Sequence, residues 1–530
     1  MPMIQGRISI LLANFAGVVG ISASQVCNAA DVTAPIKLVA SDARAYDVGA
    51  TCLALAANQL AIGVRGRDDG GMNRGAVYLF SESASGWAQY QKVTPALPVD
   101  HEEFGEAVAI TSGWLGIGGP KSDRNGIDSG TAWIFQSNGA NFVEIARLAS
   151  PTSVIGGSFG CSVALNVSAA QPVMVIGAQR EIVSGIKSGA VHVFERTSDG
   201  SWNSIARLNA TGVPTENDEF GHTVSISGNR IFVGMPGDDT TMVNAGSVFV
   251  FVRSGSSWLF EAELFAPNPQ ELAEFGANIS ASGDRVAVGS YREDGTFTNC
   301  GRVHLFVRGL AGWTLEQTLE SPVPNVGGEF GCSLSLDGDS LAVGADQESN
   351  SAIKSGKTHL FRHSTSGQWI PVASIHSTQS QSQEFAGVTV GVSSGHVAFG
   401  APFRSGSNPY EGSAFVVNLS ADCDSDFIPD LAEIASGAFD CNENAIPDSC
   451  DIAAGMPDTN GNGVPDQCEV TPCLGDIVQT GFVDAVDLAT ILAVWGTNGS
   501  PYPRADTNHD GIINGLDLST LLSSWGPCPN

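Results

Sequence analysis

The sequence predicts a mainly β protein whose largest part is a seven-bladed β-propeller of four-stranded blades. A phrase that opens on Phe-Gly recurs about every 55 residues, and each copy contains four short runs with the period-2 alternation of β-strands. The 530 residues include 63 glycines, and only 15% of the chain is charged. This composition suits short strands and tight turns better than helices. A repeat of this length predicts one blade per copy.

The first 30 residues have the order of a secretory signal peptide. Arg7 precedes an apolar run from Ile8 to about Ile21, and small residues follow near Ala29, as in the charged, apolar and cleavage regions of such peptides. The run is shorter than the about 18 to 20 apolar residues of a membrane-spanning helix. We therefore expect residues 1–30 to be a signal peptide, and the mature protein to be secreted or at the cell surface, without a membrane span.

The net charge of the chain is -30 at pH 7. A nucleic-acid backbone would be repelled by this charge, whereas proteins that bind nucleic acids gain affinity from cations that replace counterions. The composition therefore predicts no nucleic-acid partner.

The repeated phrase defines the blades. Each copy continues from Phe-Gly with an alternating run, an apolar run ending in Gly, a polar loop, a Gly-x-Val-x-x-Phe run and a run that opens on an aromatic residue. The Phe-Gly copies begin at Phe104, Phe159, Phe220, Phe275 and Phe330, with weaker copies at Val48-Gly49 and Phe385-Ala386.

The last copy has no fourth run, because the chain passes from Ser420 into acidic sequence. The segment IKLVAS at residues 36–41 matches IARLAS at residues 145–150, so we expect it to complete the last blade and close the ring. Closure hides sheet edges that would otherwise pair with other chains. The predicted propeller covers residues 33–420.

The repeats resemble the FG-GAP family, which includes the β-propeller heads of integrin α subunits. The resemblance is carried by Phe-Gly followed by Gly-Ala-Pro at residues 400–402, Gly-Gly-Pro at 118–120 and Gly-Met-Pro at 234–236. It implies a propeller fold and, by analogy with integrins, a role in adhesion.

No catalytic residues are expected in the propeller. Residues 156–160 match the GxSxG pattern of hydrolases, but that pattern requires a strand-to-helix turn, and here it overlaps the Phe-Gly of an all-β repeat. His192, His304 and His359 occupy the third-run position that Tyr78 or Trp133 takes in other copies. We interpret this position as one for a flat ring.

Residues 421–470 contain three acidic loops with a period of 18. Each loop places oxygen side chains at positions 1, 3, 5, 9 and 12, with a backbone carbonyl at 7, as Ca²⁺ requires. A disordered acidic linker would have a similar composition, but not three copies in register. The predicted Ca²⁺ ligands are Asp422, Asp424, Asp426, Ile428, Asp430 and Glu433; Asp440, Asn442, Asn444, Ile446, Asp448 and Asp451; and Asp458, Asn460, Asn462, Val464, Asp466 and Glu469.

This acidic segment lacks Lys and Arg, so calcium would compact carboxylates that otherwise repel one another. The segment resembles an array of thrombospondin type 3 repeats. Its four cysteines, Cys423, Cys441, Cys450 and Cys468, allow three pairings, and export would permit disulfides.

Residues 473–530 contain a second duplication, in which loops from Asp476 and Asp506 each precede a helix-like run ending in Trp-Gly. The first loop keeps only Asp476, Asp484 and Asp487 as carboxylates, so its binding of calcium stays open. The second loop has the pattern of a calcium site, and its predicted ligands are Asp506, Asn508, Asp510, Ile512, Asn514 and Asp517.

The duplicated segment resembles a type I dockerin, a module that docks onto cohesin domains. The resemblance implies a possible cohesin-like receptor, although the pairs Ala485-Val486 and Gly515-Leu516 stand where that family often has Ser-Thr. Cys473 and Cys528 flank the module, and a disulfide between them is a hypothesis.

Two classes of function remain open. The first is an exported, calcium-stabilised protein that binds an extracellular protein or glycan, without enzyme activity. The second is a secreted carbohydrate-active lyase or hydrolase, because propellers and dockerins occur in such enzymes and fold does not determine function. Such an enzyme would need converging carboxylates or an activated base.

Overall fold

The computed structural model describes most of the propeller and parts of the C-terminal segment. The described residues are 35–83, 85–152, 155–167, 171–212, 215–350, 352–364, 366–418, 430, 433, 438–441, 447–458, 461, 463–465, 475–478, 480, 482–497, 502–508 and 510–527. They contain seven four-stranded sheets and few helices, which confirms the mainly β prediction. The predicted signal peptide lies outside these residues. None of the helices in the described part is long and apolar enough to cross a membrane.

The first three blades are β2 (Cys52–Ala56), β3 (Gln59–Val64), β4 (Ala76–Ser83) and β5 (Gly86–Val93); β6 (Ala107–Thr111), β7 (Trp114–Gly119), β8 (Thr131–Ser137) and β9 (Phe142–Leu148); and β10 (Phe159–Asn166), β11 (Val173–Ala178), β14 (Ala190–Arg196) and β15 (Trp202–Leu208). A small hairpin extends from the third blade, formed by β12 (Ile182–Val183) and β13 (Ile186–Lys187).

The fourth, fifth and sixth blades are β16 (Val224–Ser227), β17 (Arg230–Met235), β18 (Ser247–Ser254) and β19 (Ser257–Leu264); β20 (Asn278–Ser282), β21 (Arg285–Ser290), β22 (Arg302–Gly309) and β23 (Gly312–Leu319); and β24 (Ser333–Asp337), β25 (Ser340–Ala345), β26 (Lys357–His363) and β27 (Trp369–Ile375). The seventh is β28 (Val390–Ser393), β29 (His396–Ala401), β30 (Ser413–Asn418) and β1 (Ile36–Leu38).

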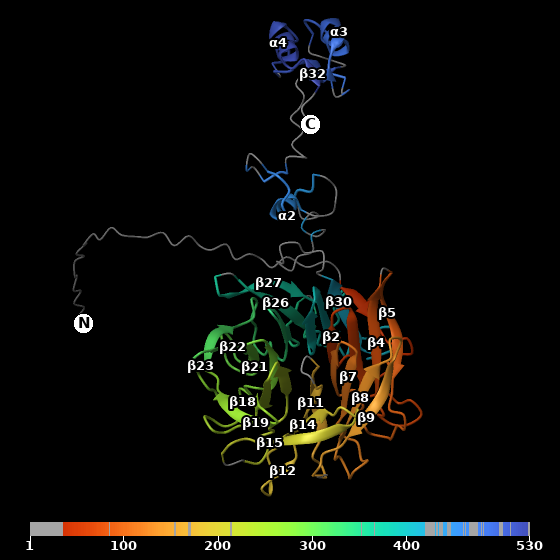
Figure 1. Ribbon diagram of the computed structural model, residues 1–530, viewed down its shortest axis with the longest axis vertical. Helices are drawn as coiled ribbons and strands as arrows, with labels where there is room; N and C mark the ends of the chain where they lie inside the picture. Colours follow the sequence, from red (N-terminus) through yellow and green to blue (C-terminus); the bar gives the residue numbers. More distant parts are fainter. Residues whose placement is uncertain are drawn as a thin grey trace, which may run out of the picture.

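The blades form a closed ring. Their first strands contact one another in the order β2, β6, β10, β16, β20, β24 and β28, and β28 contacts β2. Figure 1 shows the blades following one another in sequence order around the ring, from orange through green to teal. Hydroxyl groups join some neighbours, because Ser280 Oγ accepts a hydrogen bond from Leu336 N and Ser335 Oγ accepts one from Val392 N, both at 2.9 Å. The predicted seven-bladed propeller is confirmed.

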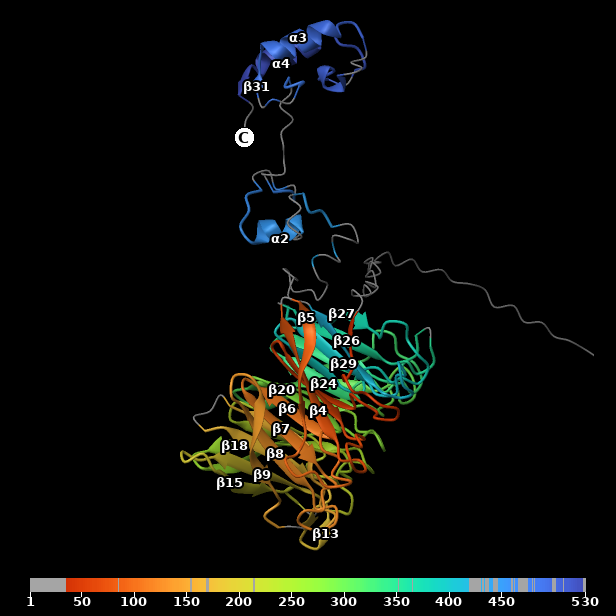
Figure 2. The same ribbon diagram turned by 90° about the vertical axis from the view of Figure 1, so that its right-hand side faces the viewer.

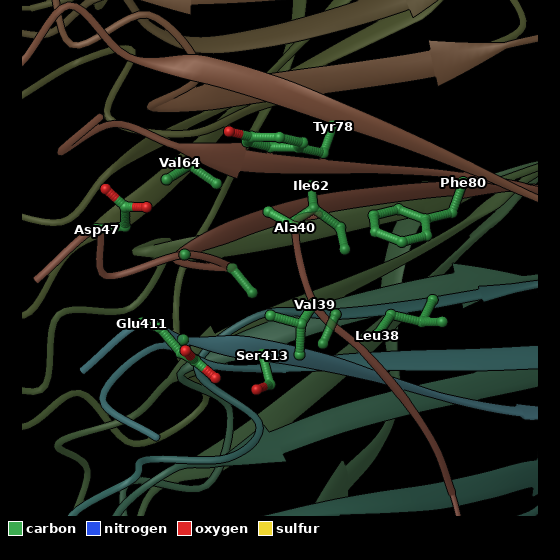
Figure 3. A pocket seen from close by; sticks show the side chains of 14 residues that line it. Leu38, Val39, Ala40, Asp47, Ile62, Val64, Tyr78, Phe80, Glu411 and Ser413 are labelled. Carbon is green, nitrogen blue, oxygen red and sulfur yellow. The ribbon is translucent and has the colours of Figure 1, made fainter. Parts of the chain in front are cut away.

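The ring closes through the predicted N-terminal strand. β1 pairs antiparallel with β30, with Ile36 opposite Val416 and Leu38 opposite Ala414. The two ends of the propeller, orange-red and teal, therefore lie side by side (Figures 1 and 2). Figure 3 shows Leu38 between these two blades, at a cavity of about 10 Å³. That volume holds about one water molecule, so this cavity is a gap in packing.

The Phe-Gly motif joins each blade to the one before it. The backbone of Phe104 bridges to Gly75 of the preceding blade, and its buried ring packs edge-on against Trp133, with the ring centroids 5.0 Å apart. A Cβ atom on Gly63 would lie 2.1 Å from the carbonyl oxygen of Gly105, so this approach requires glycine. The repeated residues are therefore determined by packing.

In the two weaker copies, the residue that forms the bridge lies one position later in the sequence than predicted. The residues that form the bridge are Gly49, which pairs with Gly412, and Ala386, which pairs with Gly356. The prediction of Val48-Gly49 and Phe385-Ala386 was therefore wrong by one position. In the last blade Ala386 lies in the same core cluster as a stacked pair, Phe399 and Phe415, whose ring centroids are 5.1 Å apart.

The C-terminal segment contains α2 (Asp448–Ala453), β31 (Phe482–Val483), α3 (Ala485–Ala493), the 3-10 helix η1 (Pro503–Ala505), α4 (Gly515–Ser523) and β32 (Gly526–Pro527). Helices α3 and α4 lie against each other (Figure 2). Capping boxes begin both helices, with Asp484 and Asp487 at α3 and Asn514 and Asp517 at α4. The helix-like runs of the second duplication are therefore helices.

Candidate functional site

Six blades contain a buried ion pair or acid–base pair at one end of the sheet, which we call the blade polar site. Four positions of a blade form it. Two lie in loops: the third residue after the second strand, and the second residue before the residue that forms the Phe-Gly bridge. The other two face each other on strands: the third-strand position that holds a flat ring in most blades, and the fourth-strand residue opposite it. Two loops and two strands thus bring these side chains together.

In blades 3, 5 and 6 the acid follows the second strand and the ring is histidine. The buried pairs are His192 Nε2 with Glu181 Oε2 at 2.8 Å, His304 Nε2 with Glu293 Oε2 at 2.7 Å, and His359 Nε2 with Glu348 Oε2 at 3.0 Å. Burial raises the pKa of Glu181, but the hydrogen bond and charge of His192 outweigh burial and hold that pKa at about 2. The interpretation as a flat-ring position missed these glutamates, although each stands three residues after an apolar run.

In blades 1, 2 and 7 the acid precedes the Phe-Gly bridge and pairs with arginine. The pairs are Asp47 Oδ2 with Arg67 Nη1 at 2.7 Å, Glu102 Oε1 with Arg124 Nε at 2.5 Å, and Glu384 Oε2 with Arg404 Nη1 at 2.5 Å. Arg67 and Arg404 are the third residues after the second strand, whereas in blade 2 that position is Ser122, which also donates to Glu102, and Arg124 lies two residues further on. The guanidinium carbon of Arg404 also lies 5.3 Å from the ring centroid of Phe415, which adds a cation–π contact.

Blade 4 differs from the other six. Asp218 and Asp238 occupy both acid positions, Phe249 occupies the ring position, and Glu263 lies opposite Phe249. These side chains line a cavity of about 390 Å³.

The predicted calcium ligands are only partly within the described residues. Those that lie outside are Asp422, Asp424, Asp426, Ile428, Asn442, Asn444, Ile446, Asn460, Asn462, Asp466 and Glu469. Cys423, Cys468, Cys473 and Cys528 also lie outside, so the disulfide pairings stay predictions. Among the propeller cysteines, Cys52, Cys161, Cys300 and Cys332 are free.

The loop from Asp506 to Asp517 is curled around its acidic side chains. Asp506 Oδ2 accepts a hydrogen bond from Gly511 N at 2.8 Å, and Asp506 Oδ1 accepts one from Asp510 N at 3.1 Å. Asp517 is buried, which raises its pKa, but backbone N–H groups including that of Asn514 donate to it and hold its pKa below the ordinary value. The loop backbone thus donates hydrogen bonds to Asp506 and Asp517, two of the residues that the sequence predicted as ligands.

The loop from Asp476 to Asp487 has the same frame. Asp476 Oδ1 accepts from Thr480 N at 2.9 Å, and Asp487 accepts from Ile477 N at 2.8 Å, as Asp506 and Asp517 do in the second loop. However, Val478 stands at the position of Asn508. The two loops share a backbone fold but differ in their supply of oxygen ligands.

The acidic repeats also contain buried carboxylates. Asp448 is buried, its Oδ1 accepts from Cys441 N at 2.9 Å, and its Oδ2 has no hydrogen-bond partner in the described segments. Asp458 Oδ2 accepts from Gly463 N at 3.0 Å, the same contact between loop positions 1 and 6 that Asp506 makes with Gly511. In the described parts of the chain, no three His, Cys, Asp or Glu side chains already form a metal cluster.

The fold defines the chain as a seven-bladed β-propeller protein. Five segments match the FG-GAP repeat family, at residues 33–80, 87–135, 202–251, 258–306 and 313–361. The propeller therefore contains FG-GAP repeats, as the sequence resemblance indicated.

Two further comparisons give no information on function. A comparison with curated proteins finds no match. One similar solved structure is the crystal structure of Saccharomyces cerevisiae Sqt1, which is 11% identical and has a TM-score of 0.40 over 73% of this chain and 99% of that chain.

Proposed function

We propose that this protein is an exported, calcium-stabilised binding or adhesion protein. The propeller presents loops to an extracellular protein or glycan, and the C-terminal segments serve as a spacer and a dock. The observation that supports this proposal most directly is the burial of Asp448, whose Oδ2 has no hydrogen-bond partner in the described segments, in a stretch, residues 421–470, that contains no Lys or Arg. Buried carboxylates require a compensating positive charge, which Ca²⁺ supplies while taking oxygen ligands.

The second dockerin-like loop fits Ca²⁺ through its donor set. Asp506, Asn508 and Asp510 offer side-chain oxygens, Ile512 offers its carbonyl, and Asn514 and Asp517 complete the loop. A bound ion would neutralise these carboxylates and fix the start of α4. The residues that hold the loop backbone, such as Gly511, would keep their present hydrogen bonds.

The two halves of the C-terminal module carry exposed apolar side chains at equivalent positions. Equivalent positions in the two halves hold exposed apolar side chains, which are Val486 and Leu516, Leu492 and Leu522, and Trp495 and Trp525. Exposed apolar side chains can contribute to protein interaction surfaces. We propose a cohesin-like receptor as the partner of this module.

Calcium titration of the chelator-treated full chain tests the calcium part of the proposal. The double variant Asp506→Asn/Asp510→Asn should lose one binding site by calorimetry, because it removes two anionic ligands from one loop. Asp284→Asn is the matched control, since the Asp284 side chain is 69% exposed and lies in the propeller. Unchanged stoichiometry in the double variant would contradict the ligand assignment.

Binding and turnover assays separate the binding protein from the alternative, a carbohydrate-active enzyme. The full chain should bind members of a panel of extracellular glycans and matrix proteins without releasing products. Reproducible hydrolysis or elimination of any polysaccharide in the panel would overturn the proposal in favour of the enzyme.

A further inference from the structure

The cavity in blade 4 indicates the chemistry of a ligand, and this inference rests on the proposal that the propeller is a binding scaffold. The cavity has a volume of about 390 Å³ and lies between the loop before β16, the loop after β17 and strands β18 and β19. Its acidic residues are Asp218, Asp238, Asp239 and Glu263, and none of its described lining residues is Lys, Arg or His.

In the other blades the ring position and the position opposite it hold at least one Lys, Arg or His side chain, whereas in blade 4 they hold Phe249 and Glu263. The residue opposite the ring position is Lys92, Arg147, Arg207 and Lys37 in blades 1, 2, 3 and 7, but Glu263 in blade 4. In blades 5 and 6 that residue is uncharged, and His304 and His359 take the ring position that Phe249 has in blade 4.

A buried carboxylate oxygen in the cavity lacks an N–H or hydroxyl donor among the described residues. Asp238 is only 4% exposed, and its Oδ1 accepts from Thr240 N at 2.8 Å and from Thr240 Oγ1 at 2.6 Å. Its Oδ2 accepts no hydrogen bond from an N–H or hydroxyl group among the described residues, its neighbour there being the carboxyl group of Glu263, and Asp238 lines the cavity. Buried polar atoms are nearly always paired, so an exception beside a cavity points to a missing donor.

Blade 7 shows what fills this site when the chain supplies the donor itself. There Arg404 stacks on Phe415 and donates to Glu384. Blade 4 has Phe249 at the position of Phe415 and Asp218 at the position of Glu384, but Asp238 replaces the arginine. The ring and the acid are thus retained, whereas the cation between them is absent from the chain.

We propose that the blade 4 cavity binds the guanidinium or ammonium group of an arginine or lysine side chain on a protein partner. The cation stacks on Phe249 and pairs with Asp238, and both contacts strengthen in a site shielded from water. Glu263 provides a second carboxylate on the opposite strand.

Binding of this cation depends on pH. Burial and the charge of Asp238 raise the pKa of Glu263 to about 7. Burial also raises the pKa of Asp218, and the negative charges of Asp238 and Asp239 raise it further. A bound cation favours the ionised form of Glu263, so binding releases protons near neutral pH. The affinity should therefore increase as the pH rises from 6 to 8.

Calorimetry with the full chain tests the proposal, using N-acetyl-arginine amide, N-acetyl-lysine amide and the neutral isostere N-acetyl-citrulline amide. We expect saturable binding of a cationic probe, no binding of the citrulline probe, and several-fold tighter binding at pH 8 than at pH 6. Asp238→Asn should weaken binding at least tenfold. Glu263→Arg should abolish it, because this arginine would pair with Asp238 as Arg207 pairs with Glu181 in blade 3.

Glu271→Gln is the matched control, because Glu271 is exposed and does not line the cavity. It removes one negative charge and should leave binding unchanged. The proposal is overturned if folded wild-type protein shows no saturable binding of either cationic probe at pH 8, or if binding persists in the folded Glu263→Arg variant. Binding of Ca²⁺ alone, lost in Asp238→Asn, would also overturn it. These outcomes leave the calcium titration of the C-terminal loops unaffected, so the two proposals fail separately.

Discussion

At the scale of single residues, the blade polar sites show how one structural need is met in two ways. Blades 1, 2 and 7 place the acid before the Phe-Gly bridge, whereas blades 3, 5 and 6 place it after the second strand. In blade 3 the acid after the second strand is Glu181, and the residue before the bridge is Gly157. In blade 7 the acid before the bridge is Glu384, and the residue after the second strand is Arg404. A buried charge requires a partner, so the positions change together within the chain.

Breaking one of these pairs should be costly. Glu293 is buried and contacts both His304 and Arg302, so Glu293→Gln should lower the free energy of unfolding by about 2 to 3 kcal/mol, because it leaves buried donors poorly paired. Denaturant unfolding measures this change. The exposed Asp284→Asn, in the same blade, should change stability by less than about 0.5 kcal/mol, and equal effects of the two variants would contradict the role of the pair.

The same sites predict how stability depends on pH. The pKa of Glu181 is about 2 in the folded protein, whereas it is 4.5 for a glutamate without these partners. The folded state therefore favours the ionised form. This stabilisation is complete above about pH 4.5 and is lost as the pH falls toward 2. Its size is about 3 kcal/mol. Unfolding of wild type and Glu181→Gln between pH 2 and 7 should show a smaller decrease for the variant, and parallel curves would contradict the assignment.

At the scale of elements, the closing strand is the shortest in the propeller blades but determines whether the ring is complete. Leu38 is 5% exposed, whereas Ile36 is 45% exposed. Leu38→Ala should therefore destabilise the protein by about 2 to 3 kcal/mol through a lost core side chain. Ile36→Ala, on the same strand, should cost less than about 1 kcal/mol. A reversed order in chemical denaturation would show that β1 does not close the ring in solution.

The sequence predicted the elements better than their contacts. Local period-2 runs and the Phe-Gly copies were sufficient to place the blades and the closing strand, because both signals lie within short segments. The bridge positions of the first and last copies were misplaced by one residue, since Gly49 and Ala386 lack the phenylalanine that marks the others. The blade polar sites were missed, because Glu102 and Arg124 meet only after two loops fold together.

At the scale of the whole molecule, the chain joins a closed ring of blades to an acidic C-terminal segment. The ring could be predicted because each repeat must pack against the next, and this repetition is visible in the sequence. The ligand-binding chemistry could not be predicted in the same way, because blade 4 is distinguished by the cation it lacks. That difference appears only when equivalent positions of the seven blades are compared in space.

The measurement that tests the central claim most directly is calorimetric unfolding of the full mature chain with Ca²⁺ and with chelator. The account predicts a transition of the C-terminal segment that moves to higher temperature with Ca²⁺, because ion binding stabilises the folded loops by mass action. The propeller transition should stay in place, since its polar sites in six blades are paired within the chain. Identical unfolding curves under both conditions would contradict the claim that calcium stabilises this protein.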